Sequence, residues 1–197
     1  PQYCRCHGSV NYFLDRTFEP SVFSFCGMRI TPWSDRELAF GKGLDELPVL
    51  LERVNGTAAR LVQLTAHVPR ERLHLRPFGR WSVAEHIGHL IYLQDRLDER
   101  VDDFAARRPE LCWIDLSHQG PVLESHRNQD LGDLIEEFRL KRDYFVRRVK
   151  ELDPGAVRHR AVNRCRGVSM TVVDTVLYVA DHDDHHLASI RGILFHD

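Results

Sequence analysis

Apolar residues recur at steps of three and four from residue 44 onward, the spacing that gathers them on one face of an α-helix. The first such stretch covers 44–67 and contains the apolar positions Leu44, Leu47, Leu50, Leu51, Val54, Ala58, Leu61, Val62 and Leu64. Pro48 falls in the first turn, where its missing N–H costs little. The pattern therefore predicts a helix over 44–67 that ends before Pro69.

A second helix is predicted over 82–107, and its start carries a clear signal. Ser82 and Glu85 have the spacing of a capping box, in which each side chain satisfies a free backbone N–H of the first turn. Trp81, directly before the cap, stands where a hydrophobic staple residue would pack. We interpret Glu85 as a capping residue, and the alternative is a catalytic carboxylate.

The rest of the chain predicts two further helices. The segment 108–129 contains proline and glycine and reads as a long crossover. A third helix over 130–152 has acids near its start and bases near its end, which matches the helix dipole. After a polar, Arg-rich loop over 157–167, Ser169 is expected to cap a fourth helix that reaches Ile193. Four amphipathic helices with one long crossover indicate an all-α fold, a four-helix bundle.

Residues 1–42 show no sustained period, so we expect an irregular N-terminal extension of uncertain order before a bundle domain over 43–197. Hydrophobic residues make up 43% of the chain, and the net charge of -2 does not favour nucleic acid or an anionic membrane as a partner. No apolar run is long enough to predict a transmembrane helix. The 5 scattered cysteines are a poor disulfide framework, which favours the cytoplasm.

Histidines provide the candidate chemistry. His182 and His186 are four residues apart on the fourth helix, so they project about 40° apart and one turn along, and two imidazoles can reach one ion. The alternative is a pair of partly buried histidines satisfied by hydrogen bonds. His185 projects about 100° away from His186, which favours a surface or supporting position. The second helix offers His86 or His89 as a third ligand.

Two segments resemble the DinB-like (DinB/YfiT) superfamily. WSVAEHIGHL, residues 81–90, is similar to the W-S-x-x-E-x-x-x-H-L motif, and DHDDHHLASI, residues 181–190, is similar to the final-helix H-x-x-H-H-x-x-Q-I motif. The resemblance spans roughly 44–195 and implies an up-up-down-down four-helix bundle. It also implies a divalent metal held by three histidines, which by position are His89, His182 and His186. Ser189 departs from the pattern, which usually has Gln there.

Three neutral imidazoles leave a metal with an open coordination position, the mark of a catalytic site. Zn²⁺ is the expected ion, with Ni²⁺, Mn²⁺ or Fe²⁺ as alternatives. The superfamily includes enzymes that use a low-molecular-weight thiol such as bacillithiol or mycothiol, so the resemblance implies a metal-dependent thiol S-transferase acting on a small-molecule substrate. Glu85 and His185 are the candidates for a catalytic residue.

Two alternatives remain open at this point: a metal-dependent hydrolase of a small substrate, and a non-enzymatic metal-holding protein of the stress response or of protein interaction. The expected assembly is a homodimer. Four arginines precede the fourth helix and could contact an anionic thiol or acid, or could belong to a solvated loop: Arg158, Arg160, Arg164 and Arg166.

Overall fold

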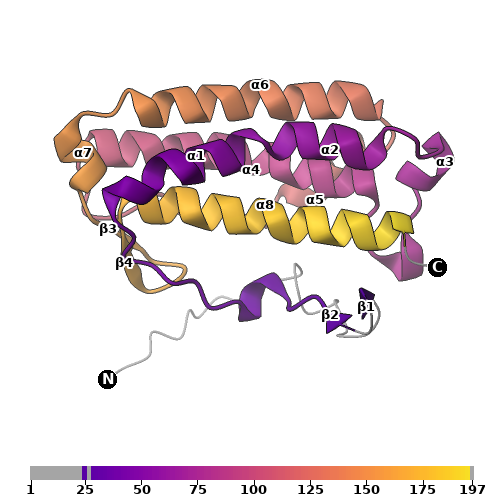
Figure 1. Cartoon of the computed structure of the whole chain (residues 1–197), viewed down its shortest axis with the longest axis horizontal. Coiled ribbons are helices and arrows are strands. Elements are labelled where there is room, and N and C mark those ends of the chain that lie inside the picture. Colours follow the sequence, from indigo (N-terminus) through magenta and orange to yellow (C-terminus); the bar gives the residue numbers. More distant parts are fainter. Residues whose placement is uncertain (1–23, 26–27, 196–197) are drawn as a thin grey trace.

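The computed structural model describes residues 24–25 and 28–195. Four long helical rods lie side by side with nearly parallel axes, and they confirm the predicted four-helix bundle (Figure 1). The first rod consists of two consecutive helices, α1 (Leu47–Asn55) and α2 (Thr57–Thr65). Each of the other three rods is a single helix: α4 (Val83–Ala105), α6 (Leu131–Lys150) and α8 (Val172–Phe195).

The first rod is interrupted where one continuous helix was predicted over 44–67. A 3-10 turn, Leu44–Glu46, leads into α1, and Gly56 separates α1 from α2. Glycine in a helix interior costs about 1 kcal/mol relative to alanine, which explains the break. The apolar face continues across it, because Val54 and Ala58 are both buried.

The rods do not follow the up-up-down-down order that the resemblance implied. Hydrogen-bonded ion pairs show the directions: Asp95–Lys141 and Asp102–Arg148 join α4 to α6, whereas Arg53–Asp181 and Arg60–Asp184 join the first rod to α8. Residue numbers rise together in both sets, so each pair of rods is parallel. The order is up-down-down-up, because the connection after α2 reverses the chain, whereas the long crossover brings it back before α6 starts.

The hydrophobic core has two halves with a polar layer between them. One half gathers around Phe104 and Phe145, and the other around Phe138 and Ile190. Between them lies one group of buried polar side chains contributed by all four rods: Thr57, Gln94, Arg142 and Asp183. These side chains are joined by hydrogen bonds and by a bidentate ion pair.

The connections contain more structure than the sequence predicted. Short helices are α3 (Arg70–Leu73), a 3-10 turn (Pro77–Gly79), α5 (Gln119–His126) inside the crossover, and α7 (Pro154–Arg158). The segment predicted as a loop over 157–167 contains β3 (Ala161–Asn163), which pairs antiparallel with β4 (Val168–Met170). Ser169 therefore lies in a strand and does not cap α8. The capping box is formed by Thr171 and Asp174, whose side chains bind each other's backbone N–H.

Part of the predicted N-terminal extension lies along α8. The backbone N–H groups of Gly41 and Lys42 donate to the Asp174 carboxylate, which tethers the chain to the start of this helix. A 3-10 turn, Trp33–Asp35, precedes this tether, and β1 (Ser24–Phe25) pairs with β2 (Met28–Arg29). Residues 1–23 of the extension lie outside the described chain, and its boundary at 42–43 stays a prediction. Within the described residues, none of the helices has the length and apolar character needed to cross a membrane.

Candidate metal centre

Three histidines from two antiparallel rods meet inside the bundle. His89 comes from α4, while His182 and His186 come from successive turns of α8, and all three are buried. The Nε2 atom of His182 lies 3.3 Å from that of His89 and 3.1 Å from that of His186. A tetrahedral metal with bonds of about 2.0–2.1 Å places its ligand nitrogens about 3.3 Å apart, so the three residues fit a metal ion.

Neighbouring side chains fix how the ligand rings are oriented. The Gln119 side-chain oxygen lies 2.9 Å from Nδ1 of His89. Because this oxygen only accepts, Nδ1 carries the proton and the lone pair of His89 is on Nε2, which faces the other two rings. Nδ1 of His186 lies 2.8 Å from Nδ1 of His86, and donation from His186 would likewise leave its Nε2 free to bind an ion.

Gln119 reaches the site because α5 approaches α4 closely. At Gly88 an added Cβ would lie 2.8 Å from Nδ1 of His126 in α5, which is closer than real Cβ contacts come. Glycine is thus required for the close approach of these two helices. The crossover then places the start of α5, where Gln119 lies, beside His89.

Burial keeps the histidine cluster uncharged. Removal from water lowers the pKa of His86 to about 3 and that of His89 to about 4. It also lowers the pKa of His182 and that of His186 well below the ordinary value, with neighbouring histidines adding to the effect. Neutral imidazole is the form that binds a metal, so the site is ready for a cation at neutral pH.

Two tryptophans cover the histidine rings. Trp81 lies against His89 at 5.0 Å between ring centroids, and its ring is nearly parallel to that of His186. It also contacts His86, the residue that a hydrophobic staple would meet, which agrees with the role predicted for it. Trp33, from the N-terminal segment, meets His182 edge-on at 5.0 Å.

The other predicted site residues have distinct positions. Glu85 and Ser82 form the predicted capping box. Both oxygens of Glu85 also bind Arg76, so its carboxylate is fully engaged at the start of α4. His185 is buried, which excludes the surface position, and its Nδ1 has no hydrogen-bond partner. Ser189 donates to the backbone oxygen of His185, a contact within α8 itself.

The sequence did not single out Gln119, and His86 was set aside as the weaker ligand candidate. A lone glutamine in a crossover has no spacing signal that would connect it to a histidine thirty residues away. The spacing of His86 does carry information, because it lies four residues before Leu90 and therefore on the same side of α4. Its contact with His186 could not be predicted, because this contact depends on how α4 packs against α8. The structure gives it a place behind His186.

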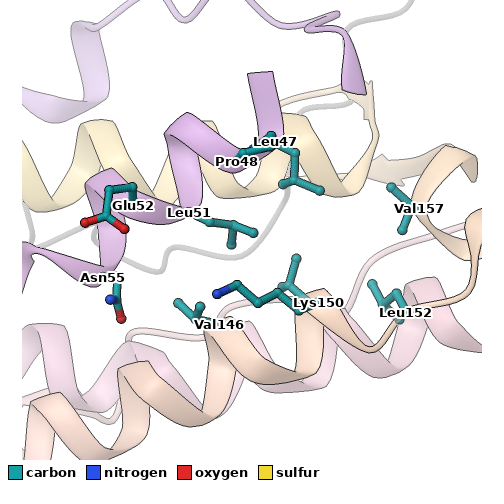
Figure 2. A pocket seen from close by; sticks show the side chains of 10 residues that line it. Leu47, Pro48, Leu51, Glu52, Asn55, Val146, Lys150, Leu152 and Val157 are labelled. Atoms are coloured by element: carbon teal, nitrogen blue, oxygen red, sulfur yellow. The ribbon is translucent and has the colours of Figure 1, made fainter. Parts of the chain in front are cut away.

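A separate groove lies between α1 and α6, away from the histidines. Figure 2 shows Leu51 of α1 facing Val146 and Lys150 of α6, with Glu52 toward one end of the groove and Leu152 toward the other. Its volume is about 400 Å³. None of its lining residues belongs to the histidine cluster, and this mixed apolar and polar lining holds no group of metal-ligating side chains.

Known structures share the fold at low sequence identity. YfiT from Bacillus subtilis, described as a probable metal-dependent hydrolase with an unusual four-helix bundle topology, matches with a TM-score of 0.69 and 13% identity over 80% of this chain and 91% of its own. A mycothiol-dependent maleylpyruvate isomerase matches with a TM-score of 0.59 and 11% identity over 73% of this chain. This match spans 60% of the isomerase's own length. A point mutant of the same isomerase matches with a TM-score of 0.60 and 10% identity, over 73% of this chain and 60% of the mutant.

Sequence comparison identifies the family. None of the curated proteins matches this chain. The family model of the DinB superfamily matches residues 53–190, which include all three histidines of the cluster and both motifs noted above. The chain therefore belongs to the DinB superfamily.

Proposed function

We propose that this protein binds one divalent metal ion through His89, His182 and His186, and uses it to transfer a group onto a low-molecular-weight thiol. The observation that carries the proposal is the convergence of three uncharged imidazole nitrogens at 3.1 and 3.3 Å inside a hydrophobic bundle. Nitrogen donors favour Zn²⁺, with Ni²⁺, Mn²⁺ and Fe²⁺ as alternatives. Three protein ligands leave room for a small molecule in the coordination shell.

When bound, the ion would act as a Lewis acid and stabilise the deprotonated form of a thiol. The protein's residues prepare that chemistry. Gln119 and His86 hold two ligand rings in place, and Trp33 and Trp81 exclude water from the rings. His185 is the better-placed candidate for accepting the thiol proton, because its Nδ1 is free of hydrogen bonds.

A relative supports this choice of reaction. The mycothiol-dependent isomerase has the same fold and uses a small thiol. In the proposed transfer the thiol sulfur forms a bond to an electrophilic carbon, the bond from that carbon to its leaving group breaks, and the thiol proton passes to the proton acceptor. The second candidate is hydrolysis of a small substrate, favoured by the higher TM-score to YfiT.

Metal analysis tests the site first. The purified wild-type protein should hold about one equivalent of divalent metal, and His186→Ala should lose most of it. His118→Ala is the matched control, because this imidazole is 85% exposed and lies outside the cluster. Equal metal content in wild type and His186→Ala would contradict the site.

Turnover tests the reaction. The metal-loaded protein is incubated with a small thiol and chlorodinitrobenzene, and release of chloride and formation of the thioether are followed. We expect turnover that disappears on metal removal and in His186→Ala. Metal-dependent hydrolysis of an ester without thiol transfer would favour the second candidate. Bound metal with neither activity would favour a metal-holding protein that is not an enzyme.

A further inference from the structure

The N-terminal segment supplies one wall of the histidine site. It lies before the part of the chain that matches the DinB superfamily, which begins at residue 53. Trp33 packs on His182 and on Tyr178, at 5.0 and 5.1 Å between ring centroids. Its indole N–H donates to the Tyr178 hydroxyl at 3.3 Å. Trp33, Tyr178 and His182 thus form one continuous aromatic surface beside the site.

Arg166 covers this aromatic surface. Its guanidinium carbon lies 5.5 Å from the centre of the Trp33 ring and 5.5 Å from that of Tyr178. Such stacking holds the planar group in place while its N–H edge stays available. Among the described residues, its hydrogen bonding is limited to a long contact of 3.5 Å with the backbone oxygen of Arg36.

The neighbouring arginines of the same hairpin are engaged elsewhere. Arg164 pairs with Glu110, Arg160 binds Ser169, and Arg158 binds the backbone of Pro154. Within the described chain, neither Arg166 nor Arg36 forms an ion pair with a carboxylate, and both are half-buried. In the described part of the N-terminal segment, the acidic residues Asp35 and Glu37 are exposed. Two cations therefore lie beside the histidine site without a counter-ion from the described residues.

Arg166 lies close to the site, and Arg36 lies beside Arg166. The Trp33 ring that Arg166 covers meets His182 edge-on at 5.0 Å between ring centroids and lies 6.1 Å from the ring of His185. Next to Trp33, the buried Nδ1 of His185 also lacks a hydrogen-bond partner. A guanidinium that covers this aromatic surface without a carboxylate partner among the described residues indicates that an anionic ligand completes this face.

We propose that Arg166, with Arg36 beside it, binds a carboxylate group of the small molecule that occupies the three-histidine site. Trp33 packs against the apolar part of the same molecule. The inference rests on the proposed function and narrows its substrate class to carboxylates. The carboxylate could belong to the thiol or to the second substrate, and the guanidinium fork matches either source.

The first arm of the test uses cobalt-loaded protein and two thiols of equal length. Mercaptopropionate carries a carboxylate and mercaptopropanol does not, and binding is followed by the visible absorption of the cobalt. We expect wild type to bind mercaptopropionate at least tenfold more tightly than mercaptopropanol. Arg166→Gln should lose that preference while keeping its cobalt content and its affinity for mercaptopropanol, and Arg166→Lys should retain part of it.

The second arm adds propionate to protein already saturated with mercaptopropanol and measures binding by calorimetry. Arg166-dependent preference in the first arm assigns the carboxylate to the thiol, and Arg166-dependent binding in the second assigns it to the other substrate. Arg164→Gln is the matched control, since this side chain is 65% exposed in the same hairpin and should change neither arm.

Two results would overturn the inference. One is that wild type shows neither a preference for mercaptopropionate in the first arm nor binding of propionate in the second. The same holds if wild type and Arg166→Gln give equal results in both arms. The other is an equal loss in Arg164→Gln. Absence of cobalt from the wild-type protein is a different result, because it would overturn the metal site itself. Circular dichroism of Arg166→Gln and Arg166→Lys checks that both variants keep the fold.

Discussion

At the scale of single residues, the candidate site depends on side chains that do not touch the metal position. Gln119 accepts from Nδ1 of His89 and thereby fixes which nitrogen of that ring can bind an ion. Removing such a partner from a metal-bound histidine typically costs 10- to 100-fold in metal affinity. We expect Gln119→Leu to weaken zinc binding by about that factor, measured by competition with a chromophoric chelator.

The control for this experiment is Gln119→Glu, which keeps an acceptor oxygen at the end of a side chain of the same length. It should bind zinc within a few-fold of wild type, because Nδ1 of His89 still has a partner. Equal affinity in Gln119→Leu and wild type would show that the ring is oriented by packing against Trp81 instead.

The same residues show how far the sequence could predict the site. His182 and His186 follow from helical spacing, because both lie on one helix and their geometry is local. His89 needed the family resemblance to be chosen over His86, because both face α8 and only packing distinguishes them. Gln119 could not be predicted, since it reaches the site through the path of a crossover.

At the scale of helices, a buried ion pair ties the rods together next to the histidines. Arg142 of α6 binds Asp183 of α8 through two hydrogen bonds, and both side chains are 1% exposed. Gln94 of α4 and Thr57 of α2 complete the set. Since Asp183 is adjacent to His182, this layer also fixes the turn of α8 that carries two of the three histidines.

Removing one member should leave a buried charge without a partner. Breaking a buried pair in this way typically costs about 3–5 kcal/mol, whereas replacing both members with apolar residues is often neutral. We therefore expect Asp183→Ala to lower the free energy of unfolding by about 3–5 kcal/mol in urea denaturation. The double variant Arg142→Met with Asp183→Leu should recover most of this loss.

A double variant as unstable as Asp183→Ala would mean that the pair contributes more than its own charges, for example by holding Thr57 and Gln94. An exposed ion pair offers the comparison: Arg139 bridges Glu136 and Asp143 on the surface of α6. Solvent-exposed pairs contribute about 0–1 kcal/mol, so Arg139→Ala should change stability little.

Helical periodicity predicted the four rods because their apolar faces repeat over many turns. It could not predict the 3-10 and α-helical turns of the connections, such as α5, whose apolar residues do not form a sustained stripe. The direction of each rod was also beyond periodicity, because a stripe looks the same in both directions. Directions became visible only through cross-helix pairs such as Asp95–Lys141.

At the scale of the whole molecule, the cluster of neutral histidines makes stability depend on pH. Folding lowers the pKa of His86 to about 3, and those of His89 and His185 to about 4, from an unfolded value of about 6.5. Below that unfolded value the unfolded chain binds protons that the folded chain excludes. The stability contributed by these residues is therefore present at neutral pH and is lost as the pH falls.

One buried carboxyl works in the opposite direction. Burial raises the pKa of Asp98 to about 6, so its protonation as the pH falls favours the folded chain. The pKa of Glu85 is lowered in the folded protein, so this carboxylate contributes to stability near neutral pH. That contribution is lost only as the pH falls below about 4.5. Between the unfolded pKa of histidine and pH about 4.5, the histidines outnumber Asp98, and the net effect is a loss of stability.

We expect the metal-free protein to lose stability steadily from pH about 6.5 to about 4.5, at up to about 1.4 kcal/mol per pH unit for each excluded proton. Urea denaturation of chelator-treated protein at a series of pH values measures this slope. Asp98→Asn removes the opposing group and should steepen the loss, which separates the histidine effect from general acid sensitivity. Zinc at 100 times its dissociation constant should add about 2.7 kcal/mol at neutral pH, because it binds the folded chain. A stability that stays constant over this range would mean that the histidines are protonated in the folded protein, and the cluster would then repel a metal ion instead of binding it.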